Sequence, residues 1–204
     1  MMILYHAPYS RSSTMVTLLH ELDAIDAVTI QPVTIQRPGN ADTKRDSRNP
    51  HPEGKVPFLT AGDDTVRERA AIVIYLCQCF PQAGLGRNFG DPDYGRFLSW
   101  LCYYQGVVEP VLVAKFTQME NDALKSSFGN FSEMSRNISE GLADKDYLLG
   151  QISAADILMA SPFMFFPDFC PDDAKIKAWV RRLSERPSFA KTAQYDKELM
   201  SPHH

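Results

Sequence analysis

Three hydroxyl side chains lie close together near the start of the sequence, in the segment YHAPYSRSS: Ser10, Ser12 and Ser13, with Arg11 among them. An apolar segment precedes them and a helical pattern follows, so they stand where a helix begins. A serine there can satisfy free backbone N–H groups of the first helical turn. A hydroxyl can also stabilise an anion by hydrogen bonding, beside the positive end of the helix. For an isolated segment of this composition, capping is the ordinary explanation of all three.

A second place suited to an anion is the junction of a predicted strand and helix at Glu68 and Arg69. Free N–H groups and the helix dipole favour negative charge at such a junction. An Arg in the first turn opposes the dipole by a few tenths of a kcal/mol, roughly. A bound carboxylate would reverse that balance, because Arg forms bidentate pairs with carboxylates. The alternatives are that Arg69 extends into solvent or pairs with Glu68 or Asp64.

The composition of the 204 residues is that of a soluble globular protein. The net charge is −4 and no basic stripe is present, which argues against nucleic acid as a partner. No signal peptide is apparent, and no segment is expected to reach the roughly 20 apolar residues that span a bilayer. We therefore expect no membrane partner and a cytoplasmic location. The cysteines lack the spacing of a metal site and are expected to be free thiols: Cys77, Cys79, Cys102 and Cys170.

The pattern of apolar residues predicts a small α/β domain over residues 1–80, in the order β-α-β-α-β-β-α with a mixed sheet. Its expected strands lie near residues 2–8, 27–35, 56–61 and 64–68, and its expected helices at 13–24 and 69–80. A short helix is expected in the polar loop between the second and third strands. Residues 81–91, rich in Gly, Pro and Asn, predict a linker, and residues 92–204 an all-helical domain. The expected helices there run from 94 to about 118, from 123 to about 143, from 153, and near 172 and 187.

This organisation and three motifs resemble the cytosolic glutathione transferases, in particular bacterial-type members with a serine-like active site. NPHPEGKVPFL resembles the family's N-P-x-G-K-V-P-x-L, with two extra residues before Gly54. VRERAAIVIYL resembles L-x-E-S-x-A-I-x-x-Y-L, with Arg69 where the family usually has Ser. YLLGQISAADILMASPF resembles F-L-x-G-x-x-x-x-A-D-I. The resemblance implies a thioredoxin-like N-terminal domain with a four-stranded sheet, an all-helical C-terminal domain, and a homodimer.

The resemblance also implies that glutathione is the co-substrate and assigns residues to its parts. Val56, before a cis Pro57, would offer its backbone N–H and C=O to the cysteinyl unit. Glu68 would face the ammonium of the γ-glutamyl group. Arg69 would face its α-carboxylate.

The thiol of glutathione must become a thiolate to attack an electrophile. A free thiol has a pKa of about 8.5 and is mostly protonated at neutral pH. In serine-type members the active hydroxyl stands six residues before the Val of the first helix, and counting back from Val16 gives Ser10. Tyr5 and Tyr9 are the alternatives, because other classes use Tyr. Residues 1–76 contain no Cys, which disfavours cysteine-based thiol transfer. The other two serines are predicted to be N-cap or first-turn residues.

The predicted helical domain carries candidate contacts for the electrophile. The resemblance assigns them to two helices, with core packing as the alternative for each: Tyr103, Tyr104, Val107 and Phe163. Ser153 and Asp156, three residues apart, form a capping-box pattern at the start of a helix. We therefore expect Asp156 to serve folding and not acid–base catalysis.

The expected function is transfer of glutathione to a small hydrophobic electrophile, without a metal. Another glutathione-dependent activity on the same fold is the first alternative: peroxide reduction, isomerisation or dehalogenation. A non-catalytic glutathione-binding or regulatory protein is the second. Arg69 and the extended HPEG loop keep that second alternative open, since both depart from the family pattern.

Overall fold

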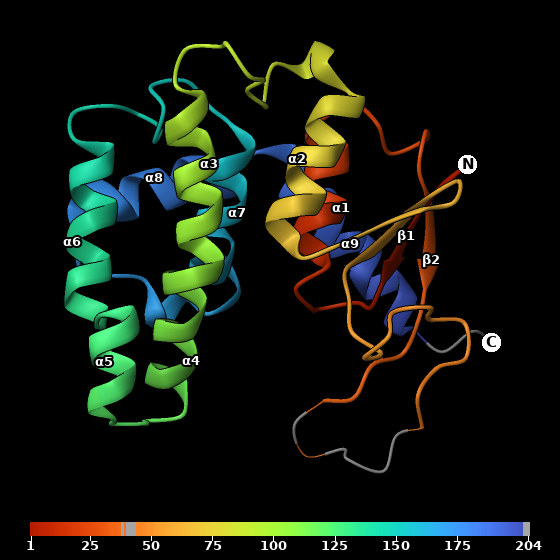
Figure 1. Ribbon diagram of the computed structural model, residues 1–204, viewed down its shortest axis with the longest axis horizontal. Coiled ribbons are helices and arrows are strands. Elements are labelled where there is room, and N and C mark those ends of the chain that lie inside the picture. Colours follow the sequence, from red (N-terminus) through yellow and green to blue (C-terminus); the bar gives the residue numbers. More distant parts are fainter. Residues whose placement is uncertain (38, 40–43, 202–204) are drawn as a thin grey trace. The chain divides into compact units, whose positions relative to one another are not determined.

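The computed structural model describes residues 1–37, 39 and 44–201, which form two compact units (Figure 1). Unit 1 comprises Met1–Ala83 together with Arg186–His204, and unit 2 comprises Gly84–Glu185. This division differs from the boundaries expected from the sequence, 1–80, 81–91 and 92–204. The difference arises because the last helix of the chain packs against the first.

Unit 1 contains a four-stranded mixed sheet in the strand order β2-β1-β3-β4. Its strands are β1 (Met2–His6), β2 (Thr29–Pro32), β3 (Phe58–Ala61) and β4 (Asp64–Arg67). The central strand β1 runs parallel to β2 and antiparallel to β3, and β3 runs antiparallel to β4. The thioredoxin-like sheet expected from the sequence is therefore present.

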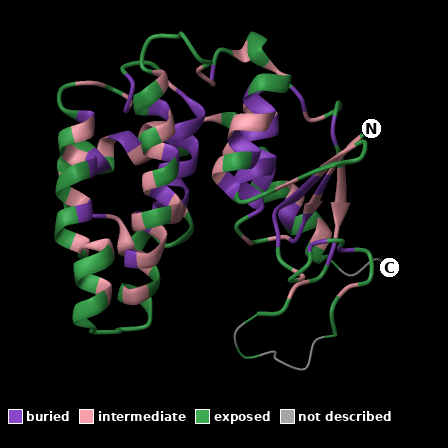
Figure 2. Ribbon diagram, in the orientation of Figure 1, coloured by how far each residue is buried: buried purple, intermediate pink, exposed green. Residues whose placement is uncertain are grey.

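Three helices complete unit 1: α1 (Ser13–Glu21), α2 (Arg69–Cys79) and α9 (Pro187–Met200). Helix α1 packs against both others, and its residues from Ser13 to Leu19 are buried (Figure 2). A 3₁₀ turn, Pro81–Ala83, follows α2. The short helix expected between β2 and β3 falls on a stretch whose residues 38 and 40–43 lie outside the described residues. The described residues of that stretch are not helical.

Helices α1 and α9 are joined by three side-chain hydrogen bonds, which we call the polar ladder. Its pairs are Ser13 with Asp196 at 2.6 Å, Thr17 with Thr192 at 2.9 Å, and Glu21 with Ser188 at 2.5 Å. The partners are spaced by four residues on each helix, so they form one stripe per helix. Arg186 adds a two-pronged ion pair to Glu21, at 2.6 and 2.8 Å. The ladder sets which turn of α9 faces which turn of α1.

Unit 2 is helical throughout its named elements, with one isolated bridge between Leu149 and Gln151. Its elements are α3 (Tyr94–Tyr103), a π-helical segment (Tyr104–Val108), α4 (Glu109–Phe116), α5 (Asp122–Phe128), α6 (Phe131–Leu142), α7 (Ala154–Phe165), a 3₁₀ turn (Pro167–Phe169) and α8 (Ala174–Ser184). The single helix expected over residues 123–143 is wrong. Gly129, at φ 76°, ends α5, and Asn130 begins α6 through a capping box with Glu133.

Helix α7 begins with the capping box expected at Ser153 and Asp156. The Asp156 carboxylate is fully buried and accepts from the backbone N–H and hydroxyl of Ser153 at 2.9 and 2.7 Å. It also accepts from the backbone N–H of Leu148 at 2.9 Å and from the indole of Trp179 at 3.0 Å. All four donors belong to unit 2, so this carboxylate joins the start of α7 to the segment at Leu148 and to α8.

The run from Tyr94 to Phe116 is helical over 23 residues with a mean hydropathy of 1.2. By length and composition alone it could cross a membrane, which corrects the expectation that no segment approaches that length. A core helix of a soluble protein passes the same test, and this run packs on α7 and α6.

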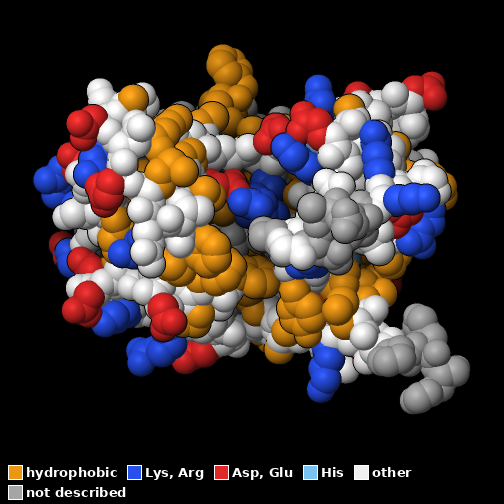
Figure 3. Space-filling model, turned by 90° about the horizontal axis from the view of Figure 1, so that it is seen from below, with side chains coloured by type: hydrophobic (Ala, Val, Ile, Leu, Met, Phe, Trp, Pro, Cys, Tyr) orange, Lys and Arg blue, Asp and Glu red, His pale blue; other side chains and the backbone are white. Residues whose placement is uncertain are grey.

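Acidic and basic side chains are mixed on the face shown in Figure 3, with hydrophobic surface between them.

Candidate functional site

Strand register brings three of the motif segments to one end of the sheet in unit 1. Tyr5, near the end of β1, pairs with Phe58 at the start of β3, and Phe58 pairs with Arg67 at the end of β4. The loop after β1, the peptide before β3 and the start of α2 therefore leave the sheet at the same end. The serine segment, the Val56–Pro57 peptide and Glu68 all belong to these connections.

The bond between Val56 and Pro57 is cis, as the resemblance implies. Val56 is 8% exposed and packs with Ala7 and Val33, so the peptide before β3 contacts the loop that follows β1. Asn49 donates from its side chain to the carbonyl of Lys55 at 3.1 Å, which ties the preceding loop to the same segment.

Glu68 adopts a backbone conformation that L side chains rarely take, with φ 72° and ψ 126°. It stands at the N-cap of α2 and is exposed, and its carbonyl accepts from Ile72 N at 3.0 Å. Strain of this kind concentrates at functional sites. Arg69 is only 6% exposed, so the alternative that its side chain extends into solvent is wrong.

Charged groups gather around this end of the sheet. The hydrogen bond to Glu53 does most to raise the pKa of Lys55, the charge of Glu68 adds to it, and the charge of Arg11 opposes it. Arg11, Lys55 and Glu68 are thus electrostatic neighbours. Within residues 1–37, 39 and 44–201, no group of three or more His, Cys, Asp or Glu side chains is placed to hold a metal ion.

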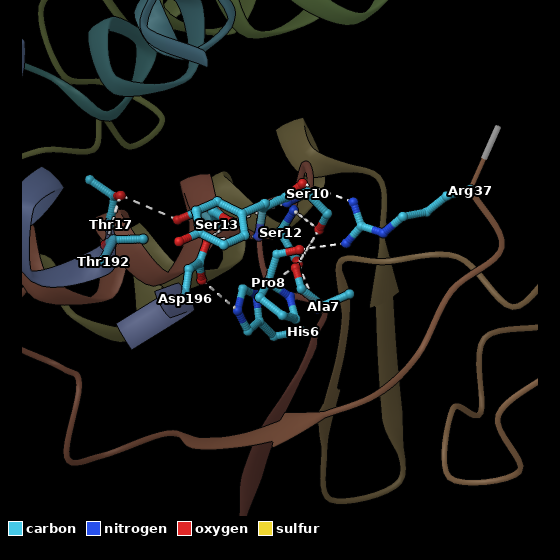
Figure 4. Close-up of polar contacts among 11 residues, drawn as sticks. His6, Ala7, Pro8, Ser10, Ser12, Ser13, Thr17, Arg37, Thr192 and Asp196 are labelled. Atoms are coloured by element: carbon cyan, nitrogen blue, oxygen red, sulfur yellow. Dashed lines mark hydrogen bonds and ion pairs between the residues drawn. The ribbon is translucent and has the colours of Figure 1, made fainter. Parts of the chain in front are cut away.

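Ser10 lies in the loop after β1 and is half-buried. Its hydroxyl donates to the carbonyl of Ala7 at 2.7 Å and lies 2.8 Å from the hydroxyl of Ser12. Arg37 holds the same loop from outside, donating to the carbonyls of Pro8 at 2.5 Å and Tyr9 at 3.2 Å (Figure 4). The candidate hydroxyl therefore sits in a loop that is fixed on both sides.

The two following serines stand where the sequence predicts, at the N-cap and in the first turn of α1, but their side chains do not cap the helix. Ser12 occupies the N-cap position of α1, but its side chain makes no capping hydrogen bond. It turns toward β1, where its Oγ accepts from Ala7 N at 3.1 Å and lies 2.8 Å from His6 Nδ1. Ser13 donates to Asp196 at 2.6 Å. Both hydroxyls are committed to tertiary contacts, because His6 and Asp196 outcompete the first turn of the helix for them.

His6 and Asp196 are the residues that sequence reasoning missed. His6 is fully buried, and its Nε2 lies 2.9 Å from Asp196 Oδ1 (Figure 4). The other carboxylate oxygen accepts from Tyr9 N at 2.8 Å and from Ser13. Burial by itself raises the pKa of the Asp196 carboxyl, but the hydrogen bonds from His6, Ser13 and Tyr9 N outweigh it and hold that pKa below its usual value. Asp196 is therefore a buried carboxylate at neutral pH.

A signal for both residues exists in the sequence. His6 alternates with Leu4 on an otherwise apolar strand, so a polar side chain occupies a core-facing position. Asp196 continues the four-residue spacing of Ser188 and Thr192, and those three are the buried residues of α9. Buried polar groups are almost always hydrogen-bonded, so each pattern calls for a partner.

The aromatic candidates of unit 2 differ in exposure. Phe163 and Tyr104 are 1% and 2% exposed and belong to the core of the unit. Tyr103 and Val107 are half-buried. Burial raises the pKa of the Tyr103 phenol, partly offset by a hydrogen bond with Asn137, and the ring packs edge-on against Trp100. Only the last turn of α3 and the π-helical segment therefore present candidate side chains with exposed surface.

Comparison with known proteins matches residues 4–84 to the model of the glutathione S-transferase N-terminal domain. A curated relative, the dichloromethane dehalogenase of Methylorubrum extorquens, is 30% identical over 169 residues, covering 70% of this chain. The chain spans 57% of the length of that dehalogenase.

Solved structures share the fold of nearly the whole chain. A glutathione transferase from Methylococcus capsulatus superposes with a TM-score of 0.78 at 21% identity, over 97% of this chain and 100% of that one. A sphingomonad glutathione S-transferase complexed with glutathione gives 0.75 at 22% identity, over 96% and 98% of the two chains. At these identities the likeness shows the fold alone.

Proposed function

We propose that this chain, whose residues 4–84 match the model of the glutathione S-transferase N-terminal domain, binds glutathione and transfers it to a small hydrophobic electrophile. One observation carries the proposal. The serine loop, the cis Val56–Pro57 peptide and the strained start of α2 meet at one end of the sheet, within a single unit. A tripeptide with a thiol, an amide backbone and a zwitterionic end needs three such groups.

The binding part of the proposal rests on two segments. Val56 has a backbone N–H and C=O beside a cis proline, a pair that suits the cysteinyl amide of glutathione. Glu68 stands at the N-terminus of α2 and supplies a negative charge for the γ-glutamyl ammonium. Arg69 follows it with a positive charge for the α-carboxylate, where the helix dipole adds attraction.

Ser10 is proposed as the catalytic residue that stabilises the thiolate. Its hydroxyl is half-buried just before α1, and its acceptors are neutral groups, the carbonyl of Ala7 at 2.7 Å or the hydroxyl of Ser12 at 2.8 Å. A sulfur anion is a stronger acceptor than a neutral carbonyl, so the hydroxyl turns to it when glutathione is bound. Tyr9 is 49% exposed, and its backbone, at φ 50°, donates from its N–H to Asp196 and accepts at its carbonyl from Arg37.

The electrophile is proposed to contact Tyr103 and Val107, while Tyr104 and Phe163 belong to the core of unit 2. Their surfaces are apolar, apart from the phenol of Tyr103, which suits a hydrophobic substrate. A cytoplasmic homodimer is the proposed assembly, and the four free cysteines suit a reducing compartment.

The relative from Methylorubrum extorquens favours a second candidate, displacement of a halide by the same thiolate. That relative is a dichloromethane dehalogenase, and in this chain the displacement would again begin with a glutathione thiolate. An assay with a generic aromatic electrophile and with dihalomethanes therefore separates the two candidates by product.

Ser10→Ala tests the proposal, with Ser99→Ala as the matched control on an exposed helix position. We expect kcat/KM to fall by about 10- to 100-fold in Ser10→Ala, since a hydrogen bond to a charged group is worth about 1.5–3 kcal/mol. Retention on immobilised glutathione should persist, because Val56, Glu68 and Arg69 remain. Turnover within about twofold of wild type would remove Ser10 from the mechanism. Wild-type protein with neither retention nor turnover would favour a non-catalytic role.

A further inference from the structure

Four side chains of unit 1 form a continuous line of hydrogen bonds that thiolate stabilisation by Ser10 alone does not use. Ser10 Oγ lies 2.8 Å from Ser12 Oγ, Ser12 Oγ lies 2.8 Å from His6 Nδ1, and His6 Nε2 lies 2.9 Å from Asp196 Oδ1 (Figure 4). We call this line the hydrogen-bond relay. Its outer member, Ser10, is half-buried, and the three inner members are 0–1% exposed.

When His6 is neutral, the available hydrogens determine which atom donates in the bonds that His6 makes to Asp196 and Ser12. Asp196 is a carboxylate and only accepts, so the neutral imidazole carries its proton on Nε2. Nδ1 is then an acceptor, and the hydroxyl of Ser12 donates to it. Ser12 Oγ also accepts from Ala7 N, and Ser10 donates to the carbonyl of Ala7 or to Ser12. In this state the relay ends on a basic nitrogen that can take one more proton.

A proton on Nδ1 reverses the two bonds that join His6 to Ser12 and Ser12 to Ser10, while Nε2–H still donates to Asp196. Nδ1–H then donates to Ser12 Oγ, whose two acceptor positions are filled by Nδ1–H and Ala7 N. The hydrogen of Ser12 then has two acceptors, Ser10 Oγ at 2.8 Å and the carbonyl of Ala7 at 3.3 Å. The shorter contact favours Ser10 Oγ, which also accepts from Ser12 N at 3.2 Å. With both acceptor positions of Ser10 filled, its single hydrogen is left to point away from the relay.

We propose that His6 receives the proton of the glutathione thiol through Ser10 and Ser12, so that making the thiolate also aims the Ser10 hydroxyl at it. The proton of the S–H bond passes to Ser10 Oγ, the proton of Ser10 to Ser12 Oγ, and the proton of Ser12 to His6 Nδ1. The sulfur keeps the electron pair and becomes the thiolate. After attack on the electrophile, the imidazolium returns its proton through the same hydroxyls to the leaving group or to water. Ser10 is the catalytic residue here; Ser12, His6 and Asp196 are positioning residues behind it. This inference rests on the proposed function.

The charges around His6 favour the transfer. Asp196 is buried with two further donors, Tyr9 N and Ser13, which keep it ionised and in place for an imidazolium. The ring of Tyr195 on α9 lies 5.9 Å from the imidazole, and burial, with the charge of Asp196, raises the pKa of its phenol. Tyr195 is therefore neutral, and of the two side chains Asp196 and Tyr195 it is Asp196 that places a charge beside the imidazole.

A purely structural role for His6 and Asp196 is the competing explanation, because both help to dock α9. The polar ladder allows a matched control, since Thr192 belongs to the same docking contact without touching the relay. Thr192→Val removes the hydrogen bond to Thr17 and should lower the melting temperature, and we expect the same of His6→Asn. If His6 and Asp196 only dock α9, then His6→Asn and Thr192→Val should change the thiol pKa of bound glutathione to the same extent.

The first experiment measures the pKa of the thiol in bound glutathione by ultraviolet absorbance of the thiolate against pH. In wild-type protein we expect a value below the roughly 8.5 of a free thiol. His6→Asn and Ser12→Ala should each raise it by at least one pH unit, and the double variant should raise it no further, because either change cuts the same relay. Thr192→Val should leave it unchanged. An unchanged thiol pKa in His6→Asn, with wild type still lowered, overturns the relay and leaves the proposed function standing. Failure of wild type to bind glutathione overturns both.

The second experiment needs no destabilised variant. Nitrogen-15 NMR of the histidine rings in wild-type protein reports protonation of both nitrogens of His6. We expect the imidazolium with glutathione and the neutral ring with S-methylglutathione, which binds the same groups but has no thiol proton. The same ring state with both ligands overturns the inference. The signal is assigned by replacing the other four histidines in turn: His20, His51, His203 and His204.

Discussion

The strained backbone of Glu68 predicts that one substitution stabilises the fold while it weakens the site. A non-glycine residue held at positive φ costs about 1–3 kcal/mol, and Glu68 is held at φ 72° and ψ 126°. Glycine adopts this conformation without steric cost, at an entropic cost of about 0.5–1 kcal/mol. Glu68→Gly and Glu68→Ala lose the same carboxylate, but only Ala keeps the strain. We therefore expect Glu68→Gly to unfold with a free energy about 1 kcal/mol higher than Glu68→Ala.

Glutathione binding should respond to the lost carboxylate and not to the strain. A hydrogen bond to a charged group contributes about 1.5–3 kcal/mol, so both variants should bind glutathione roughly 10- to 150-fold more weakly. Urea unfolding gives the stability difference, and calorimetric titration with glutathione gives the affinity. Asp93→Gly is the matched control, since Asp93 is another N-cap residue at positive φ, 62°, on α3 of unit 2. It should leave the affinity for glutathione unchanged.

Two results would refute this reasoning at different points. Equal stability of Glu68→Gly and Glu68→Ala would show that the backbone at residue 68 carries no strain that glycine relieves. Wild-type affinity in both variants would show that the carboxylate does not face the ammonium of glutathione. The second result would withdraw Glu68 from the site and leave the cis Val56–Pro57 peptide and Ser10 to be tested separately.

The remaining predictions concern the folding of unit 2. Asp156→Ala should lower the free energy of unfolding by about 3–5 kcal/mol, because the indole of Trp179 and two backbone N–H groups lose their buried acceptor. Turnover per folded molecule should not change. A selective loss of turnover would support an acid–base role for Asp156. Gly141→Ala should lower the melting temperature, since a Cβ would lie 2.2 Å from the ring of Trp100 and overpacking of about 1–3 kcal/mol outweighs a helix gain of about 1 kcal/mol. Gly95→Ala meets nothing within 4 Å and should raise it, so equal shifts for both glycines would contradict the packing argument.

What the sequence predicts well is local. The capping box of Ser153 and Asp156 depends on residues three apart and is present. The cis Val56–Pro57 peptide is also present, but it is expected from the family resemblance of its motif and not from the local residues alone. The break between α5 and α6 is local too. Asn130 and Glu133 have the spacing of a capping box, and the apolar periodicity around them hides it.

What the sequence does not show is which distant side chain completes a local pattern. Ser12 looks like a helix cap because a serine before a helix usually is one. Its actual partner, His6, is near in sequence, but the direction of the His6 ring is set by Asp196, 190 residues away. No local propensity contains that pairing, so the competition between a cap and a tertiary hydrogen bond cannot be decided before the fold is known.

The polar ladder explains how so distant a carboxylate reaches its place. Its pairs are spaced by four residues on both helices, so a shift of α9 by one turn would leave one rung of the ladder without its partner. A buried hydroxyl or carboxylate without a partner costs about 1–3 kcal/mol, and this penalty holds α9 in register. Register in turn puts Asp196 against His6, Tyr9 N and Ser13 together. The stability of the contact between α1 and α9 and the geometry behind Ser10 are therefore one property, and unit 1 is complete only when the residues after Arg186 have joined it.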